Sequence, residues 1–340
     1  MAIAPLKREI GSEFWNVPTK TRNRLFPKDT QWYLSGRSAL QTIISDLKGM
    51  RSVALPSWCC DCMIKPFVDA GYKIYFYTVV WADGHLVRNI DKECDVLLII
   101  DYFGYSSNKS DVSSYNGIVI RDITHSLFTS VYTDADYYFG SLRKWCGVWT
   151  GGFAWTKKGH KLVEKNAEDF GYTELREKAM LQKELYISGY GSAKKTYLKL
   201  FEKAEEKLES ASIAPAAIRD IALAKTLDKS FIKERRRANA KVLRNELTDM
   251  LVFPKMKHND CPMFVPVYIK NGKRDMLRRH LIENEIYCPI HWPVSAYHKL
   301  NKQTKLLYQN ELSLVCDQRY DEDDMYKICE CVKSYMRYIK

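Results

Sequence analysis

The segments IRDITHS (residues 120–126) and SLRKWCGVWTGGF (residues 141–153) decide how this sequence folds. The first continues an apolar run into charged residues, which is typical of a buried strand with polar side chains at its carboxyl end. The second follows another short strand-like run and leads to two glycines. Ligands of open α/β sheets bind beyond the carboxyl ends of parallel strands. We therefore expect Asp122 and Lys144 to lie together at one edge of a sheet.

An α/β pattern surrounds these segments. From about residue 20 to 155, short apolar runs alternate with helical patterns, as in βαβ units. Continuously apolar runs such as Val96–Ile100 indicate strands buried on both faces, in a parallel or mixed sheet covered by helices. The predicted strands are Ser52–Leu55, Lys73–Thr78, Val96–Asp101, Gly117–Asp122, Asp136–Phe139 and Gly152–Trp155, and the predicted helices are Ser38–Leu47 and Cys62–Ala70.

The later half of the chain predicts a second, smaller unit. Residues 158–250 have a mostly helical pattern, which three prolines then interrupt. Phe264–Ile269 is predicted as a strand and Arg274–Glu283 as a helix, and an apolar stripe at helical spacing predicts a last helix after Asp321. We expect an N-terminal arm (residues 1–20), a large α/β domain (residues 21–240) and a small C-terminal α+β domain (residues 241–340), with a long helix near the boundary.

Composition and charge narrow the class of protein. With 46% hydrophobic and 28% charged residues among 340, the sequence is typical of a globular protein. It contains no apolar run of membrane-spanning length and no secretory signal, so we expect a cytoplasmic protein without a membrane partner. The net charge of +12 favours anionic partners. No finger, RRM-like box or basic glycine-rich tail is present, so we expect a phosphorylated small molecule rather than nucleic acid.

The ten cysteines do not form a metal-binding pattern. Zinc needs about four well-placed ligands, and the cluster Cys59, Cys60 and Cys62 has no second pair at zinc-like spacing. We expect no metal, and we expect the cluster to fold around the cofactor turn. The cysteines scattered over the rest of the chain are expected to be reduced thiols used as small apolar side chains: Cys94, Cys146, Cys261, Cys288, Cys316, Cys329 and Cys331.

Asp122, His125 and Lys144 together match the requirements of pyridoxal 5'-phosphate (PLP). The pyridine nitrogen of this cofactor must stay protonated, and a carboxylate such as Asp122 favours that charged form. A polar neighbour such as His125 suits the phenolic oxygen of the ring, and the aldehyde needs a lysine amine. The Trp and Gly residues after Lys144 are unlike an exposed loop, so we expect Lys144 to be buried with a lowered pKa.

Each of these residues also has a structural interpretation when taken alone. Most lysines lie on the surface, and a lone His is more often a hydrogen-bonded core residue. A strand-end Asp often caps a turn, and for Asp101 that alternative is about as good as a functional one. The joint pattern of Asp122, His125 and Lys144 is what favours a cofactor site.

A phosphate cradle is predicted ahead of the first strand. In SGRSAL (residues 35–40), Gly36 allows close backbone approach and the following amides open a helix, where anions bind well. Ser-Gly-x-Ser before a helix is also a common helix cap, so this signal alone is weak.

These segments, in this order, resemble the DegT-type sugar aminotransferases of the fold-type-I PLP superfamily. The resemblance runs colinearly over nearly the whole chain, through SGRSAL, ALPSWCCDCMIKPFVDAGYKIYFY (residues 54–77), IRDITHS, SLRKWCGVWTGGF, YCPIHWP (residues 287–293) and LSLVCDQRYDEDDMYKICECV (residues 312–332). It implies a large domain with a mostly parallel mixed sheet between helices and a small C-terminal α+β domain.

The resemblance also implies a function and a site. It implies a homodimer that moves an amino group from glutamate to a nucleotide-linked keto-sugar, in surface polysaccharide or amino-sugar biosynthesis. PLP would be attached to Lys144, with Asp122 at the pyridine nitrogen and His125 at the phenolic oxygen. The residues implied to hold the phosphate are Gly36, Arg37, Ser38 and Ser141.

The chain departs from the family pattern at several positions. Arg37 stands where the family usually has Thr or Ser, and the spacing Ser141-x-x-Lys144 is closer to the general aminotransferase arrangement than to the usual spacing of the sugar enzymes. The aromatic position that covers the PLP ring is Cys60, with Trp58 two residues earlier, so either could cover it. An aminotransferase for a non-sugar ketone and a non-catalytic PLP-binding or regulatory protein remain alternatives. Further candidates for substrate or partner-subunit contacts are His291, Arg319 and Ser188–Gly191.

Overall fold

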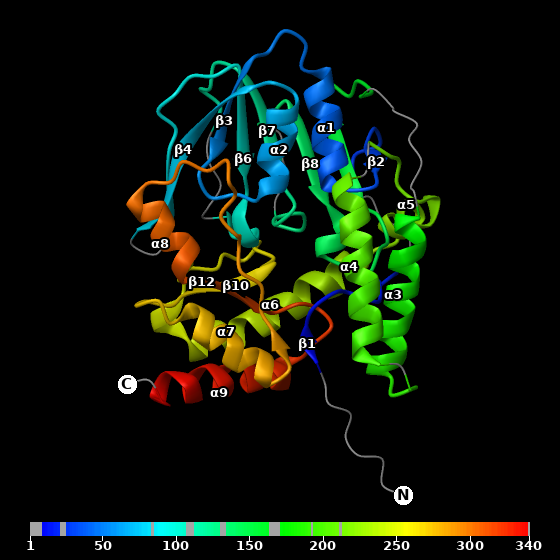
Figure 1. Ribbon diagram of the computed structural model, residues 1–340, viewed down its shortest axis with the longest axis vertical. Coiled ribbons are helices and arrows are strands. Elements are labelled where there is room, and N and C mark those ends of the chain that lie inside the picture. Colours follow the sequence, from blue (N-terminus) through cyan, green and yellow to red (C-terminus); the bar gives the residue numbers. More distant parts are fainter. Residues whose placement is uncertain are drawn as a thin grey trace, which may run out of the picture.

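An eight-stranded mixed sheet forms the centre of the larger part of the molecule (Figure 1). The computed structural model describes residues 9–20, 25–82, 85–106, 112–129, 134–162, 171–191, 193–210 and 213–338. The strand order is β2-β9-β8-β7-β6-β3-β4-β5. The strands are β2 (Gln31–Tyr33), β3 (Ser52–Pro56), β4 (Lys73–Ala82), β5 (His85–Asn89), β6 (Val96–Ile100), β7 (Ile118–Asp122), β8 (Tyr137–Ser141) and β9 (Gly152–Thr156).

The middle of this sheet is parallel. β4, β3, β6, β7 and β8 pair in parallel, whereas β5, β9 and β2 pair antiparallel with their neighbours. All five residues of β6 are buried, because helices and loops cover both faces of the central strands. The predicted mixed and mostly parallel sheet is therefore confirmed. β2 and β5 were not predicted from the sequence.

Helices pack against this sheet and beside it. Figure 1 shows α1 and α2 in front of the strands, and α1 contacts β8 and β9. α3 and α4 pack against each other as a long pair at one side. The helices of this part are α1 (Gly36–Asp46), α2 (Asp61–Asp69), α3 (Tyr172–Ile187), α4 (Lys194–Ser210), α5 (Ile218–Ala224) and α8 (Lys302–Asn310), with the 3-10 turns η1 (Tyr102–Gly104) and η3 (Leu142–Lys144).

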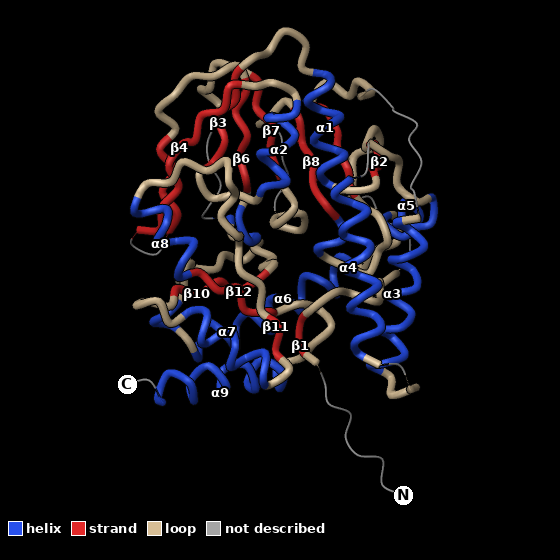
Figure 2. The backbone as a smooth tube through the Cα atoms, in the orientation of Figure 1, coloured by secondary structure: helices blue, strands red, loops and turns tan. Residues whose placement is uncertain are grey.

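A smaller unit lies below the sheet in Figure 2. It contains one antiparallel strand pair and one parallel strand pair, with helices packed against them. The parallel pair joins the beginning of the described chain to a segment almost 280 residues later. The elements are β1 (Ile10–Gly11), β10 (Phe264–Tyr268), β11 (Ile286–Tyr287), β12 (Glu311–Val315), α6 (Lys229–Glu246), η4 (Thr248–Met250), α7 (Arg274–Glu283) and α9 (Glu322–Tyr338).

Helix α6 connects the two hydrophobic cores. Ile232 packs in the core of the large sheet, whereas Ala240 and Leu243 pack in the core formed by β10, β12, α7 and α9. The division into domains at residues 20 and 240 stays a prediction. The two hydrophobic cores do not follow these boundaries. Ile10, from the predicted arm, packs in the smaller core, and Leu307, from the predicted small domain, packs in the larger one.

The cysteines fall into two groups. Cys60 and Cys62, which belong to the cluster that the sequence sets apart, form a disulfide. The other eight cysteines are free, and all but Cys331 are buried, as small apolar side chains would be. Among the described residues, no three His, Cys, Asp or Glu side chains gather where they could hold a metal ion.

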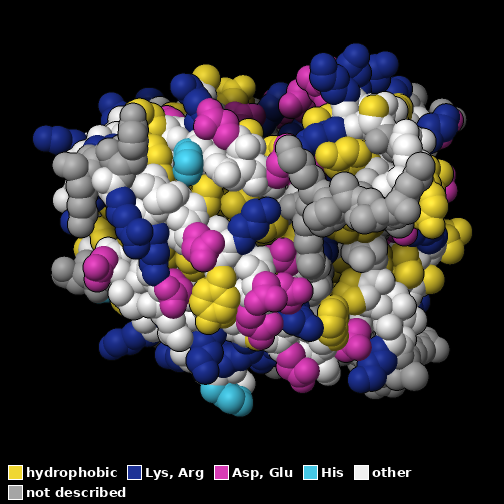
Figure 3. All heavy atoms as spheres, turned by 90° about the horizontal axis from the view of Figure 1, so that it is seen from below, with side chains coloured by type: hydrophobic (Ala, Val, Ile, Leu, Met, Phe, Trp, Pro, Cys, Tyr) yellow, Lys and Arg dark blue, Asp and Glu magenta, His cyan; other side chains and the backbone are white. Residues whose placement is uncertain are grey.

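The surface charge is mixed where it can be seen. On the face shown in Figure 3, acidic and basic side chains are interspersed, so the net charge of +12 does not form a single basic patch there. No helix within the described ranges combines the length and the apolar character needed to cross a bilayer.

Candidate active site

Asp122 and Lys144 both lie at the carboxyl edge of the large sheet. Asp122 ends β7, and Lys144 ends the turn η3 that directly follows the parallel neighbour β8. The two loops are joined, because the Trp145 indole donates a hydrogen bond to the Thr124 carbonyl (2.6 Å). The Thr124 amide in turn donates to Asp122 Oδ1 (2.8 Å). The structure thus brings both halves of the sequence motif to one place.

The Asp122 carboxylate is buried, and no cation pairs with it among the described residues. Burial raises the pKa of Asp122 to about 6, although the hydrogen bonds from Thr124 act to lower it, and the charge of Asp101 raises it further. Asp101, in contrast, forms an ion pair with Arg121 (2.7 Å). A cation that entered beside Asp122 would relieve the cost of its buried charge. Asp122 is therefore suited to a positively charged ligand.

His125 is buried as a neutral ring. The Phe103 amide donates a long hydrogen bond to Nδ1 (3.4 Å), which leaves the proton on Nε2. Burial, together with the positive charge of Lys144, lowers the pKa of His125 to about 3. A neutral His with a protonated Nε2 can donate to an oxygen at physiological pH. The ring lies against Trp292 (5.7 Å between centroids), a neighbour that the sequence did not indicate.

Lys144 lines a cavity of about 340 Å³. Its side chain is exposed, which differs from the predicted burial, but the surrounding protein still affects its charge. Desolvation and repulsion from Arg143 lower the pKa of Lys144, while the carboxylates of Glu13 and Glu205 act in the opposite direction. An accessible amine with a lowered pKa is a good nucleophile and base.

The predicted phosphate cradle lies beside the same edge. Helix α1 begins at Gly36, where an added Cβ would lie 3.4 Å from the Cβ of Ser141, so the two segments touch. Ser35 is the N-cap, because its Oγ accepts from the Ser38 amide (3.1 Å) and contacts the Ser38 hydroxyl (3.1 Å). The Nε of Arg37 is buried without a hydrogen-bond partner. An unpaired cationic donor at a helix N-terminus is suited to a phosphate.

Close packing explains the glycines that follow Lys144. A Cβ on Gly152 would lie 1.9 Å from the carbonyl oxygen of Ser35, a distance that no side chain could adopt. β9 therefore passes directly against the cap of α1. This contact fixes the N-terminus of α1, the predicted phosphate cradle, relative to β9.

Trp58 and Cys60 do not present a free surface in this structure. Trp58 is fully buried, is stacked on Tyr102 (4.8 Å), and donates from its indole to the His291 carbonyl (2.5 Å). Cys60 is the N-cap of α2 and is bonded to Cys62. Both residues lie at the end of β3, but their assignment as ring-covering residues stays a prediction.

The cavity also contains residues that the sequence motifs did not indicate. Besides Lys144, its neighbour Arg143 and the candidates His291 and Arg319, its lining comes from the N-terminal segment, α6, α7 and the loop after β12: Gly11, Ser12, Glu13, Phe14, Arg236, Arg278 and Asp317. Arg236 is 1% exposed, and its Nη2 has no hydrogen-bond partner. Ser188 and Gly191 do not line this cavity. The only sequence signal for Arg236 was the cluster of basic residues in α6, and such a cluster is also typical of a solvated helix face.

The residues at this edge fit PLP. They supply an accessible lysine amine, a buried carboxylate without a cation, a neutral His, and a helix N-terminus with an unpaired arginine donor. These are the groups that the aldehyde, the pyridine nitrogen, the phenolic oxygen and the phosphate of the cofactor require.

No sequence profile of a protein family matches the chain, and no curated protein matches it by sequence. Solved structures match its fold. A DegT DnrJ EryC1 StrS aminotransferase from Brucella abortus shares 15% identity at a TM-score of 0.59, over 90% of this chain and 85% of that chain. This chain has the fold of that family. The expectation of a fold-type-I α/β fold is therefore confirmed.

Two further structures extend the likeness over most of the chain. The Streptococcus pneumoniae protein Spr1654, named a sugar aminotransferase and solved in a PMP-form, shares 14% identity at a TM-score of 0.63, over 99% of this chain and 100% of its own. DesI, solved in the presence of its TDP-sugar product, shares 14% identity at a TM-score of 0.61, over 92% of this chain and 83% of that chain. At these identities, the likeness establishes the fold alone.

Proposed function

We propose that this protein is a PLP-dependent aminotransferase that moves an amino group from glutamate to a keto-sugar carried on a nucleotide. The observation that carries the proposal is that two groups lie at the same sheet edge: an accessible Lys144 amine, and a buried Asp122 carboxylate that has no cationic partner among the described residues. The carboxylate does not stabilise the protein, since an uncompensated buried charge costs free energy.

Each residue of the site would act on a different group of the cofactor. Bound PLP supplies an aldehyde that accepts amines and a protonated ring that withdraws electrons from the adjacent carbon. Asp122 would keep the pyridine nitrogen protonated, and the protonated Nε2 of His125 would suit the phenolic oxygen. The Nζ of Lys144 would hold the cofactor, and as a free amine it would accept and return the proton of the amino donor. Arg37 and the first amides of α1 would bind the phosphate.

The charge of the cavity supports an anionic substrate. Arg236 and Arg278 line it without a carboxylate partner among the described residues, whereas Arg143 pairs with Glu205 (2.7 Å). Arginine binds carboxylate and phosphate oxygens in a fork geometry. Glutamate and a nucleotide-linked sugar are both anions. The solved DesI structure, which has this fold, contains a TDP-sugar product, and this likeness supports the sugar class.

Absorption spectroscopy of the purified protein tests the proposal. After incubation with PLP, we expect a visible band that glutamate shifts toward shorter wavelength, and borohydride should fix the cofactor to the peptide that contains Lys144. Lys144→Ala should lose the fixed adduct and amino transfer by at least about a thousandfold. The exposed Lys48→Ala is the matched control and should behave as the wild type. A Lys144→Ala variant with full activity would refute the assignment.

We further propose that the chain is divided into the arm, large domain and small domain that the sequence predicts. We also propose that the protein acts as a homodimer. Large apolar side chains such as Ile218 (85% exposed) and Tyr190 (78% exposed) lie on its surface and would be covered in an assembly. Light scattering should give twice the chain mass of 39.7 kDa, and a mass of one chain would overturn this part.

A further inference from the structure

The N-terminal segment Gly11–Phe14 lines the same cavity as Lys144, although it is separated from it by about 130 residues of sequence. It follows β1, which pairs in parallel with β11 (Ile10 opposite Ile286). No sequence motif indicates that this segment lies at the site. Its backbone and its one carboxylate therefore need an explanation.

The backbone of this segment is held in an unusual conformation. Gly11 has φ = 95°, and Ser12 has φ = 60°, which side-chain-bearing residues rarely adopt. A Cβ on Gly11 would lie 2.2 Å from the Tyr287 carbonyl oxygen, so only glycine fits there. Strain of this kind persists where surrounding contacts impose it, and it often marks functional sites. The turn directs the chain from the strand pair into the cavity.

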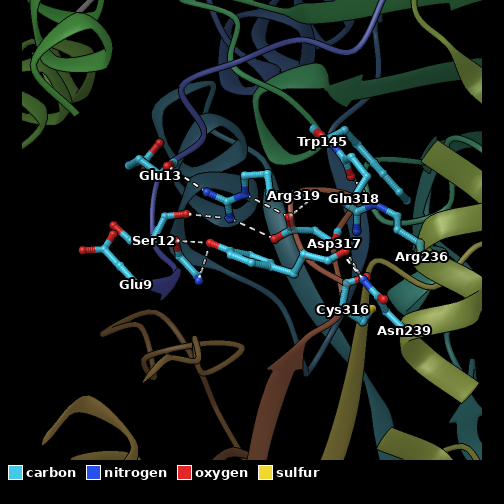
Figure 4. A network of polar contacts seen from close by, with 12 residues as sticks. Glu9, Ser12, Glu13, Trp145, Arg236, Asn239, Cys316, Asp317, Gln318 and Arg319 are labelled. Atoms are coloured by element: carbon cyan, nitrogen blue, oxygen red, sulfur yellow. Dashed lines mark hydrogen bonds and ion pairs between the residues drawn. The ribbon is translucent and has the colours of Figure 1, made fainter. Parts of the chain in front are cut away.

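Arg319 and its neighbours impose that turn. Arg319 donates to the carbonyl oxygens of Ser12 (3.2 Å) and Glu13 (3.0 Å). Its guanidinium is itself fixed by Asp317, through Nε (2.9 Å) and Nη2 (2.8 Å), and lies 4.0 Å from the centre of the Phe14 ring. Figure 4 shows Arg319 between Asp317 and the Ser12–Glu13 backbone. Arg319 thus holds the segment, and its hydrogen bonds are directed to protein groups.

Glu13 brings a carboxylate into a chain of ion pairs whose arginines are largely buried. Its Oε2 pairs with Arg176 Nη1 (3.0 Å), which lies 3.8 Å from Glu205, and Glu205 pairs with Arg143, the residue before Lys144. Burial acts to raise the pKa of Glu13, but the charges of Arg176, Arg143 and Lys144 outweigh it and lower the pKa to about 2. Glu13 is therefore ionised throughout the physiological range, and its side chain remains 41% exposed.

We propose that Glu13 is a positioning residue of the Lys144 site, which the strained N-terminal segment delivers into the cavity to balance the charge of the Lys144 amine. The proposal rests on the proposed function only in treating Lys144 as the reactive lysine. The charged and titratable groups that act on Lys144, or line the cavity with it, come from every surrounding element: Glu13, His125, Arg143, Arg176, Glu205, Arg236, Arg278, Tyr287, Cys288, His291, Asp317 and Arg319.

The sign of the effect is fixed by electrostatics. The negative charge of Glu13 stabilises the ammonium form of Lys144, whereas Arg143 and Arg176 destabilise it. Removing the carboxylate therefore favours the neutral amine. Only the neutral amine reacts with an acylating reagent, so the change appears as a shift of the pH profile for acylation.

Competitive acetylation with trace acetic anhydride, read by mass spectrometry of the Lys144 peptide in the full chain, measures this profile without added PLP. Glu13→Gln should move the midpoint to lower pH by about one unit, as expected for one charge in a partly buried site. Glu13→Asp, which keeps the charge at a shorter reach, should move it less and in the same direction. A wild-type midpoint in folded Glu13→Gln overturns the proposal.

The controls separate this effect from folding and from cofactor chemistry. Glu174→Gln removes an exposed carboxylate of α3 that pairs only with Lys178, and it should leave the Lys144 profile unchanged. If Glu13→Gln fails to fold, Glu13→Asp decides alone, and an unchanged midpoint there overturns the proposal. If the profiles shift as expected but no PLP is taken up, the proposed function fails and the positioning role of Glu13 stands.

Discussion

At the scale of a single residue, Asp122 lowers the stability of the free protein, although its charge suits a positively charged ligand. Its carboxylate is buried, with hydrogen bonds from Thr124 but no cation to pair with. The folded protein retains the Asp122 proton up to about pH 6, whereas the ordinary pKa of an Asp is 3.8. Between these values the folded state binds more protons, so this group makes the protein less stable as pH rises through that window.

Asp122→Asn should therefore stabilise the cofactor-free protein at pH 8 by about 2 to 3 kcal/mol, because it removes a buried charge. The gain should shrink at pH 5, where Asp122 is mostly neutral in the wild type. Chemical denaturation at the two pH values measures both. The same variant should bind PLP at least about tenfold more weakly, as determined by absorbance titration. Equal gains at both pH values would show that Asp122 is charged in the folded protein at both, so that its pKa is not raised.

At the scale of secondary-structure elements, the contact between β9 and the cap of α1 is the most restrictive one near the site. Gly152→Ala would bring a methyl group to 1.9 Å from the Ser35 carbonyl oxygen. We expect a loss of about 3 kcal/mol in the free energy of unfolding, since backbone atoms cannot move aside easily. Gly49→Ala, with open space but φ = 81°, should cost only about 1 kcal/mol. Urea unfolding compares the two, and equal losses would contradict the steric explanation.

The elements that the sequence predicted best are those with a regular apolar pattern, either continuous as in β6 or at helical spacing as in α7. β6 is apolar throughout because it is covered on both faces, and α7 was predicted with its observed bounds of Arg274–Glu283. β12 was missed because Glu311 and Ser313 interrupt its apolar pattern, and both are buried through mutual hydrogen bonding. β1 and β11 are two residues long, too short for any periodicity.

The candidate site was predictable only in part, for the same physical reason. Lys144, Asp122 and His125 lie in continuous motifs at strand ends, where local sequence determines the structure. Glu13 and Arg278 reach the cavity through long-range packing, which no local pattern contains. Arg319, a candidate for substrate contact, does line the cavity, and its guanidinium also binds Asp317 and two backbone carbonyls; its contact with substrate stays a prediction.

At the scale of the whole molecule, Arg236 on α6 couples the two hydrophobic cores. It stacks on Trp145 (4.4 Å), which belongs to the core of the large sheet, and donates to Gln318 (2.7 Å) and to the Met263 carbonyl (2.9 Å). Because all these partners are buried, removing the guanidinium leaves their polar atoms unpaired. The unfolding of the two cores would then be less cooperative.

Arg236→Met should lower the free energy of unfolding by about 2 to 4 kcal/mol and broaden the thermal transition. Differential scanning calorimetry checks this, since the van't Hoff enthalpy should fall further below the calorimetric one. Arg235→Gln is the matched control, because Arg235 is partly exposed and has only a surface pair with Glu322 (3.3 Å). A single sharp transition in Arg236→Met would show that α6 alone transmits the coupling.

The pairing of β1 with β11 has a consequence for how the protein is made. Gly11 donates its amide hydrogen to the hydroxyl of Tyr320, 309 positions later. At a synthesis rate of about 5 to 20 residues per second, these two residues leave the ribosome roughly 15 to 60 seconds apart. Gly11 therefore has no Tyr320 to bind until that residue emerges. During that interval the nascent chain can fold its large sheet around Lys144, but the wall of the cavity that carries Glu13 closes only after Tyr320 has left the ribosome.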